Sequence, residues 1–202
     1  MEINYVCSLG TRCHVAQILK NNNLKKCSYP FDWIFSDPDI VKHCIEDKFN
    51  IFLDKTYYIK LKEKMCGHSY YHPKMFNHHN PLNTNDYDYY KRCVERFTQL
   101  LQYKENKLFI MMFVNTKNFE ETLKKKVIEF NDKFSKFVSN YKLLVIIHIN
   151  KGKQNHILTQ LDSIDFLELH TLSNSNGLNF INLKDNTYLN ITLNKIYNFK
   201  IK

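Results

Sequence analysis

The sequence predicts an α/β fold: a single domain, 1–202, with a central mixed, mostly parallel sheet that is flanked by helices and carries a long irregular insertion. Two continuous apolar runs of strand length, at 107–114 and 143–149, are typical of strands buried on both faces of a parallel sheet. Between them, apolar residues recur at spacings of three and four over 119–137, which predicts an amphipathic helix. Strands that alternate with helices indicate an α/β architecture.

The beginning of the chain follows the same order of elements. A strand is predicted over 3–9 and a helix over 12–20. The run Asn21-Asn22-Asn23 ends that helix, because asparagine tolerates the left-handed conformation of a C-terminal cap. Ser36-Asp37-Pro38 has the pattern of an N-cap followed by proline in the first turn, so a short helix is predicted over 39–47.

The middle of the chain is less regular. Residues 50–86 are rich in Tyr, His and Asn, and we interpret them as a long functional loop or a small insertion rather than as core. A helix then begins near Tyr87, since apolar residues from Tyr90 onward fall on one face. Two later and more exposed strands are predicted at 166–172 and 178–183, joined by a turn at 173–177.

The composition excludes several classes of protein. Hydrophobic residues make up 44% of the chain, and glycine and proline occur four times each, which excludes a disordered or linker-rich protein. No apolar stretch reaches the roughly 20 residues of a membrane-spanning helix, and the N-terminus lacks a signal-peptide pattern. Since the six cysteines include no CxxC pair, we expect reduced thiols, a cytoplasmic protein and no membrane partner.

The net charge of +9 favours phosphate-rich partners such as RNA or a nucleotide. A second source of the charge is equally consistent with the sequence, because abundant Lys, Asn, Ile, Phe and Tyr are what an AT-rich genome encodes. The chain has no Walker loop, no GxGxxG and no GxSxG motif, which argues against common nucleotide-binding and serine-hydrolase designs. We expect no cofactor.

Cys13 is the residue for which spacing indicates chemistry. It follows the first strand and the turn at Gly10, and it opens the first helix. Unpaired N–H groups and the helix dipole at such a position favour a thiolate, and Arg12 acts in the same direction. The alternative is that Cys13 is a buried cysteine that fills space, as Cys7 and Cys93 are expected to do.

Histidines are concentrated at positions 68, 72, 78 and 79, and two interpretations compete. In the first, one of them is the general base for Cys13, with Asn77, Asn80 or Asp32 orienting it. In the second, a zinc ion is bound by a set whose spacing is irregular for zinc: Cys66, His68, His72 and one of His78 or His79. His148 and His170 lie in apolar strand patterns and are expected to be core residues with satisfied hydrogen bonds.

Three segments resemble an uncharacterised family of papain-like cysteine peptidases found in bacteria and large DNA viruses. They are Ser8-Leu9-Gly10-x-x-Cys13 after the first strand, Pro30-Phe31-Asp32-Trp33, and Phe76-Asn77-His78 ahead of a helix that carries Arg92 and Arg96. The strand Leu108-Phe109-Ile110 also fits, so the resemblance covers roughly 3–115. It implies Cys13 as nucleophile, His78 as base and Asp32 as the third member, with His79 standing where an acid is expected.

The resemblance implies a thiol hydrolase that cleaves an amide bond in a protein or peptide, and a viral member would act in the host cytoplasm. The substrate-binding candidates are Arg12, Phe31, Trp33 and His79. The alternative is a non-catalytic nucleic-acid-binding module for an mRNA cap or single-stranded RNA, in which Trp33 and Phe31 stack on bases above a basic surface. The sequence leaves the oligomeric state open.

Overall fold

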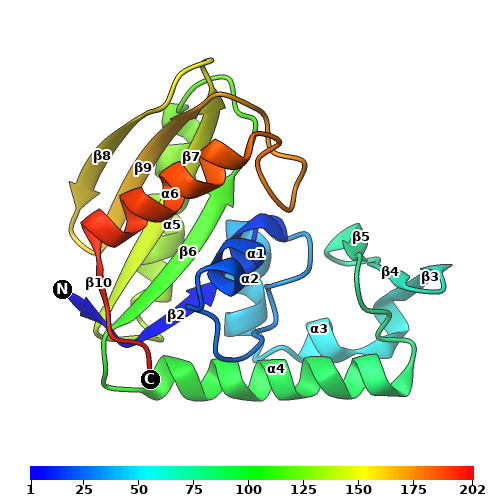
Figure 1. Ribbon diagram of the computed structural model, residues 1–202. Coiled ribbons are helices and arrows are strands. Elements are labelled where there is room, and N and C mark those ends of the chain that lie inside the picture. The colour runs from blue at the N-terminus through cyan, green and yellow to red at the C-terminus, as the bar shows by residue number, and fades with distance from the viewer.

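The computed structural model describes residues 1–202 and confirms the α/β fold, built on a five-stranded sheet with strand order β2-β6-β7-β9-β8 (Figure 1). Its strands are β2 (Tyr5–Ser8), β6 (Lys107–Phe113), β7 (Tyr141–Asn150), β8 (Asn155–Leu161) and β9 (Ile164–Thr171). Four of them are parallel, and only β8 is antiparallel to its neighbour β9. The mixed, mostly parallel sheet was therefore predicted correctly.

Helices cover both faces of this sheet, α1 and α6 on one and α2 and α5 on the other (Figure 1). The helices are α1 (His14–Asn21), α2 (Pro38–Glu46), α3 (Asn50–Leu53), α4 (Thr84–Gln102), α5 (Glu121–Phe134) and α6 (Leu183–Ile196). Successive strand side chains point to opposite faces. In β6, Phe109 and Met111 accordingly belong to one apolar cluster, whereas Leu108 and Ile110 belong to the other. None of the helices is long and apolar enough to cross a membrane.

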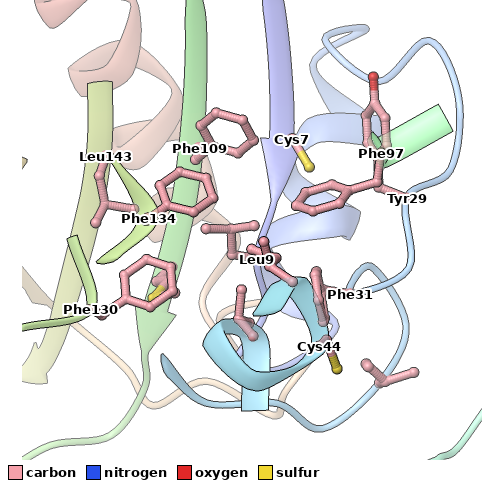
Figure 2. Close-up of a cluster of buried hydrophobic side chains, with 14 of the residues drawn as sticks. Cys7, Leu9, Tyr29, Phe31, Cys44, Phe97, Phe109, Phe130, Phe134 and Leu143 are labelled. Atoms are coloured by element: carbon pink, nitrogen blue, oxygen red, sulfur yellow. The ribbon is translucent and has the colours of Figure 1, made fainter. Parts of the chain in front are cut away.

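The larger cluster contains 29 buried residues, and aromatic rings connect its parts (Figure 2). Phe109 of β6 meets Phe134 of α5 edge to face at 4.9 Å between ring centroids. Phe31 meets Phe97 of α4 in the same way at 5.5 Å. These contacts attach α4 and the segment around Phe31 to the same core as the main sheet.

The start of α2 forms as the sequence predicts. The Asp37 carboxylate accepts a hydrogen bond from the Ile40 backbone N–H at 2.9 Å, and Pro38 occupies the first helical position. The helix after residue 84 and the long helix on the 119–137 pattern also form, as α4 and α5.

Of the two interpretations of 50–86, the structure supports a small insertion rather than a long irregular loop, but part of the segment belongs to the core, contrary to the prediction. The segment contains α3, a short 3-10 helix (Lys55–Tyr57) and an antiparallel sheet of β3 (Tyr58–Lys62), β4 (Met65–His68) and β5 (His72–Phe76). Its buried apolar residues are Phe52, Cys66, Met75 and Phe76, which belong to the larger apolar cluster. Phe76, for example, lies against Phe52 of α3 and Tyr90 of α4.

Two predictions near the C-terminus were wrong, and two elements there were missed. The segment 178–183 is a loop that ends at α6, not a strand, and β8 and α6 were not predicted at all. β9 is buried along nearly its whole length rather than exposed. The two chain ends meet in a small parallel pair of β1 (Glu2–Ile3) and β10 (Asn198–Phe199).

The turn after β2 is packed against the segment before α2. Ser36 donates through its hydroxyl to the Leu9 carbonyl at 3.0 Å and through its backbone N–H to the Thr11 carbonyl at 3.3 Å. Gly10 lies between them with φ +90°, and a Cβ added there would stand 1.8 Å from Ser36 Oγ. Only glycine fits this turn.

We expect Gly10→Ala to lower the free energy of unfolding by about 3 kcal/mol, because the new methyl group would combine a left-handed backbone strain with a steric clash. Gly152→Ala is the matched control, since Gly152 has φ +66° but no heavy atom within 4 Å of an added Cβ. That variant should lose only about 1 kcal/mol. Urea unfolding followed by circular dichroism measures both, and equal losses would contradict the tight packing at Gly10.

Candidate active site

Cys13 lies at the carboxyl end of β2, as the N-cap residue of α1, and its side chain is 7% exposed. The preceding loop is attached to the end of β6. The Thr11 hydroxyl donates to the Met112 carbonyl at 2.7 Å, and the Met112 N–H donates to the Gly10 carbonyl at 3.2 Å. The N–H groups in the first turn of any helix have no intrahelical acceptor. No side chain caps α1, so these groups also lack a side-chain acceptor beside the thiol.

His78 reaches the same region from the small sheet. Ile34 forms an isolated β-bridge with Phe76, and the Phe35 N–H donates to the Met75 carbonyl at 3.0 Å. This bridge ties the end of β5 to the segment 34–36, which in turn packs on the turn at Gly10. The chain leaves β5 two residues before His78, so the bridge sets where the imidazole stands.

Cys13 and His78 line one cavity of about 360 Å³. The structure thus brings together the predicted nucleophile and base from separate parts of the fold. No hydrogen bond joins the two side chains, and the imidazole instead packs edge-on against Trp33 with 5.8 Å between ring centroids. Catalytic hydrogen bonds are often long before a substrate binds. The full lining is Arg12, Cys13, Phe35, Met65, Asn77, His78, Asn176, Gly177 and Leu178.

The protonation of the pair differs from the sequence-based expectation. Burial raises the pKa of the Cys13 thiol to about 11, although its own backbone N–H and the Arg12 guanidinium act in the opposite direction. The prediction of a stabilised thiolate was therefore wrong, because desolvation outweighs the backbone N–H and the Arg12 charge here. Burial, and to a lesser degree His79, lowers the pKa of His78. At neutral pH the pair is a thiol beside a neutral imidazole that is free to accept a proton.

Asp32 is not brought to His78. Its carboxylate is buried, forms an ion pair with Lys25 and accepts the Tyr29 N–H at 2.9 Å. Burial raises the pKa of this carboxyl, an effect that Lys25 opposes. Asp32 accepts a hydrogen bond within its own turn and pairs with the partly buried Lys25. It contacts neither Cys13 nor His78.

The acceptor nearest in sequence to His78 is Asn77. It lines the cavity, and its Oδ1 is buried with no hydrogen-bond partner. An unpaired buried carbonyl oxygen is costly, which makes it an acceptor that a bound molecule can satisfy. Asn80 faces elsewhere, because its side chain donates to the Glu63 carbonyl and accepts the Leu82 N–H.

The other substrate-binding candidates separate into three cases. Arg12 is exposed and borders the cavity. Phe31 has no exposed surface and belongs to the core, so the prediction that it contacts a substrate was wrong. His79 bonds to the Asp86 carboxylate at 3.1 Å and stacks on Tyr89, and it does not line the cavity. Trp33 is half-buried and, like His79, does not line this cavity, although it borders a separate one.

The side chains considered for zinc binding do not converge. Cys66 and His68 are buried, with the Cys66 thiol directed to the Gly67 carbonyl and His68 Nε2 at 3.0 Å from the Ile51 carbonyl. His72 packs on Phe35. No group of three or more His, Cys, Asp or Glu residues is arranged to hold a metal ion.

One wall of the cavity was missed by sequence reasoning. It is the loop between β9 and α6, which contributes Asn176, Gly177 and Leu178. In Figure 1 this loop leaves the top of the sheet and descends towards α1. Its asparagine- and glycine-rich sequence indicated a turn, but not that the turn borders the cysteine.

A buried polar network holds this loop in place. Ser175 Oγ lies 2.8 Å from His14 Nδ1 and accepts the Gly177 N–H at 3.0 Å. Asn115 pairs with the Ser175 backbone through both ends of its amide. His148 Nδ1 accepts the Asn115 N–H at 2.9 Å, which confirms His148 as a core histidine with satisfied hydrogen bonds. The network therefore joins the ends of β2, β6, β7 and β9.

The chain matches a known protein family. The model of the family "Putative papain-like cysteine peptidase (DUF1796)" matches residues 4–180. An uncharacterized protein of Acanthamoeba polyphaga mimivirus is 25% identical over 166 residues, which cover 73% of this chain and 37% of that protein. The chain thus spans well under half of the length of this viral relative. No solved structure matches.

The raised pKa of the Cys13 thiol predicts how its alkylation rate depends on pH. Because only the thiolate is alkylated, its rate with iodoacetamide should rise about tenfold per pH unit above pH 7 and continue to rise towards the thiol pKa of about 11. Peptide mass spectrometry resolves Cys13 from the half-buried Cys27, which controls for reagent quality, and circular dichroism controls for unfolding. A plateau below about pH 8.5, the value of an unperturbed thiol, would contradict this assignment.

Proposed function

This chain belongs to the "Putative papain-like cysteine peptidase (DUF1796)" family, and on that basis we propose that it is a thiol hydrolase that cleaves an amide bond with Cys13 as nucleophile. The observation that supports this proposal most directly is the single open cavity shared by Cys13 and His78. A thiol and a neutral imidazole in one cavity are the minimum for base-assisted nucleophilic attack.

The proposed reaction begins when the substrate carbonyl enters the cavity. Cys13 Sγ attacks the carbonyl carbon while its proton passes to His78, so no free thiolate accumulates. Free N–H groups at the first turn of α1 donate to the oxyanion that forms. The imidazolium of His78 then protonates the leaving amine as the C–N bond breaks. Water, deprotonated by His78, hydrolyses the thioester and restores the thiol.

This route uses general-base catalysis rather than a preformed ion pair. Burial raises the thiol pKa and lowers the imidazole pKa, and both shifts oppose a resting thiolate–imidazolium pair. The Trp33 ring holds the imidazole of His78.

We expect Cys13→Ala to abolish turnover and His78→Ala to lower kcat by about 100-fold or more, since a general base contributes on this scale. His79→Ala is the matched control, because the neighbouring histidine bonds to Asp86 and stays outside the cavity. Cleavage of a proteome-derived peptide library, read by mass spectrometry of new N-termini, measures turnover. Undiminished cleavage by Cys13→Ala would refute the proposal.

Asp32→Asn separates the two roles considered for that residue. Breaking its buried ion pair with Lys25 should lower the free energy of unfolding by about 3 kcal/mol. The folded protein should keep its kcat, because Asp32 contacts neither Cys13 nor His78. Urea unfolding and the peptide assay together test this. A large loss of kcat at unchanged stability would instead favour Asp32 as the orienting residue.

A second candidate function, binding of single-stranded RNA or a nucleotide, is favoured by a different cavity. It has a volume of about 340 Å³ and is lined by Lys20, Lys25, Lys26, Cys27, Ser28 and Trp33. Lysines beside a half-buried indole combine phosphate attraction with a stacking surface. Lys25 is bonded to Asp32 and to the Cys27 carbonyl, so Lys20 and Lys26 are the lysines available to phosphates.

Trp33 is the only tryptophan, so its fluorescence reports on this cavity directly. If RNA binds there, an oligouridylate should quench the fluorescence, and affinity should fall steeply with salt concentration. Lys26→Gln should weaken binding several-fold, whereas Lys136→Gln, an exposed lysine at the end of α5, should not. Absence of quenching at low salt would exclude this second candidate.

A further inference from the structure

The cavity around Cys13 contains one charged side chain. Of its nine lining residues, eight carry no charge at neutral pH, because burial lowers the pKa of His78 and the others are thiol, apolar, amide or glycine residues. The ninth is Arg12, whose guanidinium stays protonated in proteins. The electrostatic character of the site is therefore set by a single cation next to the nucleophile.

The Arg12 guanidinium has no acidic partner in the protein. It is exposed, and none of the salt bridges of the chain includes it. Its carbon stands 5.0 Å from the centroid of the Phe35 ring, a cation–π contact that orients the group and leaves its edge donors free. An oriented guanidinium without a carboxylate is suited to bind one from another molecule.

Arg12 and Phe35 both border a further cavity as well, of about 280 Å³. The only carboxylate in that cavity, Asp37, accepts the Ile40 N–H at 2.9 Å as the cap of α2 and forms no ion pair with Arg12. His72 also lines that cavity, and in its neutral form it supplies no charge to pair with Arg12. The guanidinium thus borders both the Cys13 cavity and this further cavity, which is large enough for one side chain of a bound molecule.

We infer that Arg12 binds a carboxylate of the substrate close to the scissile bond, so that the enzyme acts on peptides with an acidic residue there. This inference rests on the proposed function for its substrate class. The anion site itself is a property of the protein and is testable without any cleavage reaction. The excess of 29 basic over 20 acidic residues acts in the same direction by attracting acidic partners.

Two alkylating reagents of nearly equal size test the anion site at Cys13 directly. Iodoacetate carries a carboxylate and iodoacetamide a neutral amide, and in both reactions the Cys13 sulfur displaces iodide and loses its proton to solvent. The ratio of the two rates cancels any change in the thiol pKa, because both reagents need the same thiolate. At pH 9, we expect the iodoacetate-to-iodoacetamide ratio at Cys13 to exceed that of Arg12→Gln by about tenfold.

Arg12→Gln should abolish this preference and Arg12→Glu should reverse it, whereas Lys195→Gln, an exposed lysine on α6, should leave it unchanged. Arg12 is exposed, so its replacement is not expected to affect folding. Equal ratios in the wild type and Arg12→Gln would overturn the inference.

Matched peptides then connect the anion site to the substrate. A peptide with Asp beside the cleaved bond should be cleaved about tenfold faster than the Asn version, and Arg12→Gln should remove this difference. Cleavage that depends on Cys13 but not on Asp would overturn the substrate class while leaving the hydrolase intact. No cleavage together with a retained alkylation ratio would refute the hydrolase and leave the anion site standing.

Discussion

The contact between Ser36 and the turn at Gly10 determines how the two halves of the site meet. Ser36 bonds to the carbonyls of Leu9 and Thr11, and the turn has room for it only because residue 10 has no side chain. On one side of this contact the turn leads to Cys13, and on the other the segment 34–36 is bridged to β5 and hence to His78. A main sheet and a small antiparallel sheet are joined at this point, and the cavity forms along the junction.

Burial gives this cavity its chemistry. The Cys13 thiol is buried, and desolvation raises its pKa, while partial desolvation lowers the pKa of the more exposed His78 imidazole, so both groups are neutral at neutral pH. Arg12 is exposed and retains its charge. A network of buried polar side chains supports the opposite wall through Ser175 and Asn115. The result is a pair of neutral side chains, Cys13 and His78, on a cavity beside one oriented cation.

Much of the fold was predictable because it depends on local patterns. The continuous apolar runs of β6 and β7 and the Asp37-Pro38 cap are each encoded by neighbouring residues. β8 was missed because it is an edge strand whose apolar residues are partly exposed, as Ile157 is at 52%. The segment 178–183 was wrongly predicted as a strand because its apolar residues are not buried: Ile181 and Leu183 are 67% and 77% exposed. The spacing of apolar residues therefore does not indicate a buried strand face there. The motifs indicated Cys13 and His78, and the structure places both on one cavity, but the pairing of Asp32 with Lys25 arises only in three dimensions.

The pairing of β1 with β10 has a consequence for how this domain can be joined to other chains. Glu2 and Asn198 are neighbours in register, and because the pair is parallel the chain continues past it until the Lys202 N–H donates to the Asn4 carbonyl at 3.1 Å, so the first and last residues lie at opposite ends of one short strand pair. This pair lies near the amino ends of the parallel strands, while the cavity lies at the carboxyl ends. Circular permutation through a linker that spans this strand pair, or fusion of another domain to either end, would therefore leave the Cys13 cavity unobstructed.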